Sequence, residues 1–192
     1  MNTQDLSPKV QQEIIEAFKN DPNEFEKIYN YYYERILKYL LKRTASAEAA
    51  YDITAETFMK AFESFHKFKW TGVSVKVWLY RIAINALKNH RRKAKSVVLT
   101  AEMEGMEIMA TSAQEEIDEL DKAMHGDEDL SKLSDAIATL NPKYQNVVSL
   151  HYFEGMSHRE IGQTIKRSES AVKSMMHRAM TNLRQLLATN HI

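Results

Sequence analysis

The sequence contains no cysteine, only three prolines and five glycines, and no long hydrophobic run in its 192 residues. Without cysteine the chain forms no disulfide and no cysteine-based zinc site, as is usual in a reducing compartment. No apolar run approaches the roughly 20 residues that a membrane-spanning helix needs. The N-terminal stretch MNTQDLSPKVQQEII lacks the basic and apolar segments of a signal peptide, so we expect a cytoplasmic protein.

The scarcity of helix-breaking residues predicts a helical fold. Each proline follows a residue that caps helices well, which is a common start of a helix: Ser7-Pro8, Asp21-Pro22 and Asn141-Pro142. No alternation of apolar and polar residues is long enough for a β-strand. With 44% hydrophobic and 27% charged residues, the composition is that of a globular protein with a core. The expected fold class is all-α.

The net charge of zero conceals three blocks. Residues 1–94 carry 16 Lys/Arg and 11 Asp/Glu, a net of +5; residues 95–133 carry 3 and 11, a net of −8; residues 134–192 carry 7 and 4, a net of +3. The middle block has no aromatic residue and is typical of a flexible acidic linker, with at most a fraying helix around Glu115 to Met124. We therefore expect two small helical domains, residues 21–94 and 134–192, joined by this linker. Residues 1–20 form an amphipathic helical extension whose role the sequence leaves open.

Periodic apolar residues predict the core of the first domain. A third helix is expected from Ser46 to about His66, and a short loop over residues 67–74 separates it from the next helix. The stripe expected to face the core between residues 22 and 43 is Phe25, Ile28, Tyr29, Tyr32, Ile36, Tyr39 and Leu40.

The helix that follows, Val75 to Lys93, contains six Lys or Arg and no acidic residue. One arc of it is apolar and should pack against the core. The other side carries a stripe of basic residues. A basic stripe is usually a solvated face, but solvated faces normally mix charges of both signs. A stripe of one sign that includes an amide suits phosphates and base edges. The residues of this stripe, spaced four, three and four apart, are Arg81, Asn85, Lys88 and Arg92.

The second domain has the pattern of a helix-turn-helix. Asn141-Pro142 opens a helix to about Phe153, and Ser157 with Glu160 forms a capping box before a short helix, HREIGQTI. Ser168 then caps a longer amphipathic helix. An αα-hairpin inside a bundle is the alternative, but the small, polar and basic residues of the exposed face favour a DNA reader. Those residues are Ser170, Lys173, Ser174, His177, Arg178 and Thr181, and His151 lies nearby as a phosphate contact.

Two blocks of the sequence resemble bacterial sigma factors of the extracytoplasmic-function group. DPNEFEKIYNYYYERILKYLLKR, DITAETFMKAF and VWLYRIAINALKNHRRK are similar to region 2 of that family, although Ala55 replaces a usual Gln. The stretch from LSDAIATLNPKYQ to MTNLRQLL is similar to region 4 almost from end to end. Residues 21–94 would then be region 2 and residues 134–192 region 4.

The resemblance implies a function. Region 2 of such proteins binds the clamp helices of the polymerase β′ subunit and opens the −10 promoter element, capturing a flipped base. Region 4 reads the −35 element in the major groove and contacts the β-flap. The implied partners are core RNA polymerase, promoter DNA and an anti-sigma factor, without cofactor, metal or enzymatic activity.

Carried over by position, the resemblance assigns roles to single residues. The residues that would bind the polymerase are Asp52 and Glu56, which lie four residues apart on one helix face. The −10 contacts are Phe68, Trp70, Arg81, Asn85, Lys88, Arg91 and Arg92. The −35 contacts are His151, Ser170, Lys173, Ser174, His177 and Arg178.

Two other classes compete with this interpretation. An enzyme is disfavoured because the sequence has no H-E-x-x-H, no P-loop and no glycine-rich dinucleotide turn. A helix-turn-helix regulator that is not a sigma factor would share the C-terminal block. It would leave the basic stripe and the pair Asp52/Glu56 without a role.

Overall fold

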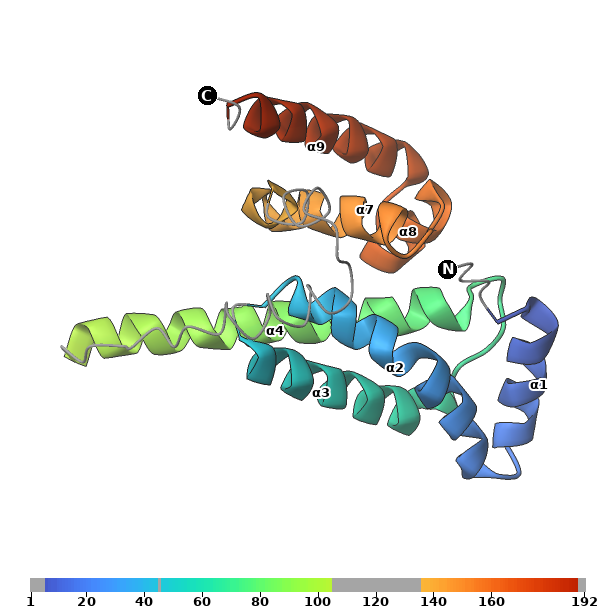
Figure 1. Cartoon of the computed structure of the whole chain (residues 1–192). Coiled ribbons are helices and arrows are strands. Elements are labelled where there is room, and N and C mark those ends of the chain that lie inside the picture. The colour runs from blue at the N-terminus through green and yellow to red at the C-terminus, as the bar shows by residue number, and fades with distance from the viewer. Residues whose placement is uncertain (1–5, 45, 105–135, 190–192) are drawn as a thin grey trace. The chain divides into compact units, whose positions relative to one another are not determined.

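The computed structural model describes residues 6–44, 46–104 and 136–189, which belong to two compact units (Figure 1). The first unit lies within residues 1–114 and the second within residues 115–192. Every regular element of the described residues is a helix, which confirms the all-α prediction. Most of the expected acidic linker, including the helix expected around Glu115, falls outside the described residues.

The helices of the first unit begin where the capping residues predict. Ser7, Asp21 and Ser46 each accept a hydrogen bond from a backbone N–H of the following turn, which satisfies one of the unpaired groups of a helix start. The elements are α1 (Pro8–Phe18), the 3₁₀-helix η1 (Pro22–Glu24), α2 (Phe25–Leu41), α3 (Ala47–Phe65) and α4 (Val75–Glu104).

The core of the first unit lies between α2, α3 and α4, which all contact one another. The apolar stripe of α2 is buried as predicted except for Tyr29, which is 40% exposed. The Tyr29 ring instead packs against Tyr33 and Phe58 at the edge of the α2–α3 contact, with centroids 4.9 and 5.0 Å away. Each fully buried aliphatic side chain contributes about 1.5–3 kcal/mol. The α2 stripe therefore fixes one face of α3 and of α4, and so decides which residues stay exposed.

Helix α4 extends further than the expected domain. It continues to Glu104, ten residues past the expected end at residue 94. The segment KSVVLTAEME contains neither glycine nor proline, so no residue in it terminates the helix. The beginning of the predicted linker is thus helical.

The second unit consists of a helical turn over residues 136–139 followed by α7 (Pro142–Tyr152), α8 (His158–Ile165) and α9 (Glu169–Thr189). The buried Gln145 side chain joins the first turn to α7, because its Nε2 donates to the carbonyls of Ala138 and Leu140. The core of this unit is formed by Val147, Leu150, Met156, Ile161, Val172, Ala179 and Leu183. No helix in the described parts of either unit is long and apolar enough to cross a membrane.

Candidate nucleic-acid and protein-binding surfaces

The basic stripe of α4 is partly exposed. Asn85, Lys88 and Arg92 face solvent, whereas Arg81 is half-buried and its Nε is fully buried. The exposed part therefore presents an amide and two cations within about two turns of one helix. Cations attract phosphates and the amide can both donate to and accept from a base edge.

Arg91 ties α4 to the end of α2. It is half-buried, and its Nη2 donates to the backbone carbonyl of Arg43 at 2.6 Å, across 48 residues of sequence. Burial first, and the positive charge of Arg43 second, lower the pKa of Arg91. The Arg43 guanidinium itself lies 4.7 Å from the centre of the Tyr39 ring. Arg91 thus has a structural contact that the sequence did not reveal, and its expected DNA contact stays a prediction.

The loop after α3 carries two half-buried aromatic residues, Phe68 and Trp70. Phe68 is parallel to Phe65, with centroids 6.0 Å apart, and lies 4.9 Å from the ring of Trp78 in the first turn of α4. One side of the Phe68 ring therefore rests on the core. The first residue of the α4 stripe, Arg81, follows this loop by about two helical turns.

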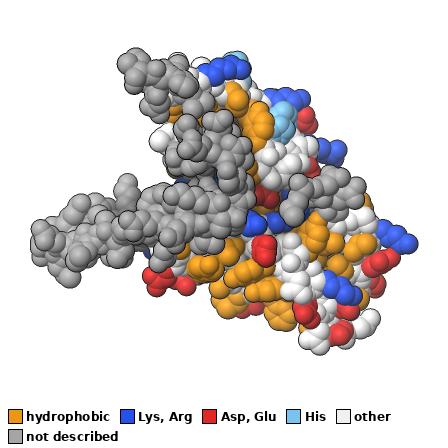
Figure 2. Space-filling view, in the orientation of Figure 1, with side chains coloured by type: hydrophobic (Ala, Val, Ile, Leu, Met, Phe, Trp, Pro, Cys, Tyr) orange, Lys and Arg blue, Asp and Glu red, His pale blue; other side chains and the backbone are white. Residues whose placement is uncertain are grey.

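The exposed face of α3 mixes acidic and large apolar residues. Asp52 is exposed, and the Glu56 side chain is 35% exposed and forms an ion pair with Lys60. Met59 and Phe62 on the same helix are 59% and 46% exposed. In the first unit, Figure 2 shows hydrophobic side chains gathered over α2 and α3 among charged ones. Exposed apolar residues beside carboxylates are more typical of a protein-binding surface than of a DNA-binding one.

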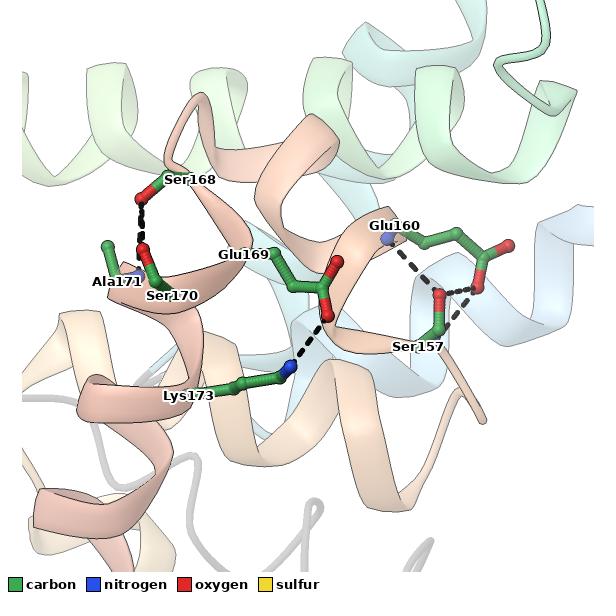
Figure 3. Close-up of polar contacts among 7 residues, drawn as sticks. All are labelled: Ser157, Glu160, Ser168, Glu169, Ser170, Ala171 and Lys173. Carbon is green, nitrogen blue, oxygen red and sulfur yellow. Dashed lines mark hydrogen bonds and ion pairs between the residues drawn. The ribbon is translucent and has the colours of Figure 1, made fainter.

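Two caps hold the starts of α8 and α9 (Figure 3). Ser157 Oγ accepts from the Glu160 N–H at 3.3 Å, and the Glu160 carboxylate accepts from the Ser157 N–H at 2.9 Å, so the predicted capping box is confirmed. Ser168 Oγ accepts from the Ala171 N–H at 3.2 Å and caps α9, also as predicted. Between the caps the Arg167 N–H donates to the Gly162 carbonyl at 2.9 Å. A Cβ on Gly162 would lie 2.6 Å from the Arg167 carbonyl oxygen, so this close approach requires glycine.

These caps orient α9 with one side in the core and the other in solvent. Val172, Met176, Ala179 and Leu183 are buried. The opposite side is exposed along its length and consists of Ser170, Lys173, Ser174, His177, Arg178 and Thr181. The orientation expected from the sequence is confirmed, and this polar and basic face has the chemistry of a recognition helix.

Glu169, which the sequence interpretation did not single out, lies at the start of this face. Its carboxylate is 2.9 Å from Lys173 Nζ, as Figure 3 shows. The hydrogen bond and the charge of Lys173 lower the pKa of Glu169, with smaller contributions from His158 and Arg159 at the start of α8. This pair could have been predicted from the sequence, because a Glu four residues before a Lys on a helix commonly forms an ion pair.

His151 supports the segment before α8. Its Nδ1–H donates to the Met156 carbonyl at 2.9 Å, and its ring stacks on His158 with centroids 5.0 Å apart. The described residues contain no group of three His, Asp or Glu side chains that could hold a metal ion.

Comparison with known proteins matches both units to one family. The model of Sigma-70 region 2 matches residues 28–97, and that of Sigma-70 region 4 matches residues 130–183. The chain belongs to the sigma-70 family. Helix α1 and the last turns of α4 lie outside the matched residues.

Similar curated proteins include several RNA polymerase sigma factors. The chain is 28% identical over 179 residues to the ECF RNA polymerase sigma factor BldN of Streptomyces coelicolor, covering 91% of this chain but only 65% of BldN. It is 28% identical to the RNA polymerase sigma factor YlaC and to the ECF RNA polymerase sigma factor SigW, both of Bacillus subtilis. There the alignment covers 83% and 93% of this chain and 90% and 96% of the relative. This sigma factor is therefore of the extracytoplasmic-function (ECF) type.

Solved structures agree with the fold. CnrH, in complex with the cytosolic domain of CnrY, has a TM-score of 0.67 at 16% identity, covering 93% of this chain and 97% of CnrH. The sigma factor RpoE of Bartonella quintana, in complex with the anti-sigma factor NepR, has a TM-score of 0.71 at 21% identity, covering 86% and 98%.

Proposed function

We propose that this sigma factor binds core RNA polymerase in the cytoplasm, directs it to promoters by recognising −35 and −10 elements, and opens the −10 element. It acts by positioning the polymerase and the DNA and performs no catalysis of its own. The observation that carries the proposal is the fully exposed polar and basic face of α9, held by two caps in a unit that matches region 4.

The α9 face reads the −35 element as duplex DNA. An α-helix fits the major groove, and the residues near its N-terminus reach the base edges. Lys173 and Arg178 are the cations of this face, and Ser170, Ser174 and His177 supply smaller polar contacts. His151, whose ring stacks on His158 at the start of α8, contributes a phosphate contact.

The α4 stripe binds the strand that opens at the −10 element. Lys88 and Arg92 hold phosphates, with Arg81 and Arg91 supporting them from half-buried positions. Asn85 pairs with a base edge that has lost its partner. Phe68 and Trp70 in the preceding loop offer aromatic surface to an unstacked base, a contact worth about 1–3 kcal/mol.

The acidic and apolar face of α3 binds the polymerase. Asp52 and Glu56 supply carboxylates for charge-assisted hydrogen bonds to the β′ clamp helices. Met59 and Phe62 supply apolar area next to them. CnrH and RpoE were solved with CnrY and NepR bound. By analogy, we propose that an anti-sigma factor covers DNA- or polymerase-binding surfaces of this chain, while the β-flap binds the second unit.

Transcription in vitro tests the function. The chain is added to core polymerase with a library of promoter fragments from the source genome, and run-off transcripts are sequenced. We expect transcripts with defined 5′ ends that share sequence elements near −10 and −35, and loss of these transcripts when Lys173 and Arg178 are both changed to Ala. A helix-turn-helix regulator would yield no transcript without another sigma factor, and that result would refute the proposal.

A further inference from the structure

Helix α1 lies outside the residues that match region 2, yet it is part of the core of the first unit. Its inner face buries Gln11, Ile14 and Phe18. A buried glutamine is uncommon, because its amide must find hydrogen-bond partners away from water. The contacts of Gln11 and Phe18 lead to the two ends of one segment, the loop over residues 67–74.

The C-terminal end of α1 supports the start of that loop through aromatic rings. Phe18 meets Phe65 edge to face, with centroids 4.8 Å apart, and Phe65 in turn lies parallel to Phe68 at 6.0 Å. A cavity of about 250 Å³ is lined by Ile15 and Phe18 of α1, by its C-cap residue Lys19, by Pro22 of η1, and by Phe65, His66 and Phe68. Helix α1 is thus one wall of the space beside Phe68.

The N-terminal end of α1 holds the end of the same loop. The Gln11 side chain is 3% exposed. Its Oε1 accepts the N–H of Val75, the first residue of α4, at 2.9 Å, and its Nε2 donates to the Leu6 carbonyl at 2.5 Å. The first N–H groups of a helix have no partner within the helix, so Gln11 caps α4 from 64 residues away.

Ser74 adds a local cap, because its Oγ accepts the Val77 N–H at 3.3 Å and its carbonyl accepts the Trp78 N–H. Trp78 in turn contacts Phe68. The place where α4 begins therefore determines where the Trp78 and Phe68 rings meet.

We propose that α1 is a brace that fixes both ends of the 67–74 loop, and that Gln11 is a positioning residue for promoter opening. This inference rests on the proposed function, in which the loop and the α4 stripe bind the opened strand. If Val75 loses its cap, the first turn of α4 frays and Trp78 no longer supports Phe68. The loop then samples many positions, and an unstacked base meets an aromatic surface that is not in place.

Three variants separate positioning from general stability. Gln11→Met keeps the length of the side chain and removes both hydrogen bonds. Gln11→Glu keeps an oxygen that can accept the Val75 N–H, next to the positive end of the α4 dipole. It also replaces the donor to Leu6 by an oxygen that faces the Leu6 carbonyl and places a carboxylate at a buried position. Ile14→Ala removes buried apolar volume from the same face of α1 without removing the cap, and so serves as the control for destabilisation.

The first readout requires no DNA. The two tryptophans of the chain are Trp70 and Trp78, so tryptophan fluorescence reports on the loop and the first turn of α4 alone. In the full-length chain we expect Gln11→Met to increase acrylamide quenching of the tryptophans and to raise hydrogen exchange of the Val75 amide by about tenfold. Ile14→Ala should leave both near the wild-type values, and Gln11→Glu, which keeps the acceptor for the Val75 N–H, should change both less than Gln11→Met does. If Gln11→Met changes neither quenching nor exchange, the brace is refuted, whatever transcription shows.

The second readout is the opening rate, followed with a fluorescent base analogue in the −10 element and well below the melting temperature of every variant. With core polymerase, we expect Gln11→Met to open a paired promoter about tenfold more slowly than the wild type does. On a pre-melted template the variant should match the wild type. Equal slowing by Ile14→Ala, or a wild-type rate for Gln11→Met, would overturn the role in opening. Asn85→Ala, measured in parallel, tests the proposed function separately, because it should slow opening while leaving tryptophan quenching and Val75 exchange unchanged. A wild-type opening rate for Asn85→Ala would contradict the proposed function and not the brace.

Discussion

At the scale of single residues, Lys166 has a strained backbone conformation. It ends α8 with φ 57° and ψ 54°, the left-handed conformation that side chains with a Cβ adopt at a cost of about 1–2 kcal/mol. It is the one non-glycine residue with positive φ among the described residues. The helix-turn-helix therefore stores strain in its turn.

Lys166→Gly should relieve this strain and stabilise the second unit by about 1 kcal/mol, because glycine reaches this conformation without a steric cost. Hydrogen exchange of the α8 and α9 amides in the full-length chain measures the effect. Arg167→Gly is the matched control, since Arg167 has negative φ and glycine there only adds unfolded-state entropy. Slower exchange in the control as well would contradict the assignment of strain to Lys166.

Glu169 limits what Lys173 can do. Lys173 is the main cause of the lowered pKa of Glu169. The ion pair therefore stabilises the fold above the unfolded-state pKa of Glu169, and this stabilisation is lost as the pH falls through the folded-state pKa. At neutral pH, Lys173 is consequently held by a carboxylate instead of being free for a phosphate.

Glu169→Gln should increase affinity for non-cognate duplex DNA and steepen its dependence on salt by about one counterion, since Lys173 becomes available to the backbone. Fluorescence anisotropy of labelled duplexes over a salt series checks this. Glu13→Gln, which breaks a comparable pair with Lys9 on α1, should change nothing. An unchanged salt slope for Glu169→Gln would contradict the claim that the ion pair keeps Lys173 from the DNA backbone.

At the scale of helices, local signals were sufficient for the second unit. The starts of α7, α8 and α9 follow from Asn141, Ser157 and Ser168, because a cap and the helix that it starts lie within a few residues of each other. The same holds for α1 and α3. The exposed face of α9 followed from the apolar period alone.

Contacts between distant segments could not be predicted from the sequence. The bond from Arg91 to Arg43 spans 48 residues, and that from Gln11 to Val75 spans 64. Neither residue type implies its partner, so only a DNA contact was predicted for Arg91, and no role was predicted for α1. The length of α4 was also missed, because charge composition marked a linker where no helix-breaking residue occurs.

The exposed face of α3 should carry the polymerase contact. Asp52→Ala combined with Glu56→Ala should weaken binding to core polymerase by about 1.5–3 kcal/mol per lost charge-assisted bond, with the fold intact. The Glu56–Lys60 pair is a surface pair of small value. Glu34→Ala, which breaks the equivalent pair with Lys38 on α2, is the control. Titration of labelled core enzyme measures the affinities of the double variant and of the control. Equal affinities for the wild type and the double variant would show that the polymerase does not bind this face.

At the scale of the whole molecule, the proposed function assigns paired DNA to one unit and opened DNA to the other. The α9 face suits paired DNA in a major groove, whereas the α4 stripe and the 67–74 loop suit a base that has left its partner. Substitutions in the two units should therefore fail at different steps of initiation. A loss in the second unit should prevent the closed complex, and a loss in the first should leave that complex formed but unopened.

The most direct test of this account compares Asn85→Ala with Arg178→Ala on one promoter, paired or pre-melted at −10, with closed-complex formation and opening measured separately. Arg178→Ala should weaken the closed complex by about 1–3 kcal/mol on both templates if it contacts a guanine edge. Asn85→Ala should form the closed complex normally, open the paired template slowly and recover on the pre-melted one. Opening of the paired template at the wild-type rate by Asn85→Ala would contradict the account.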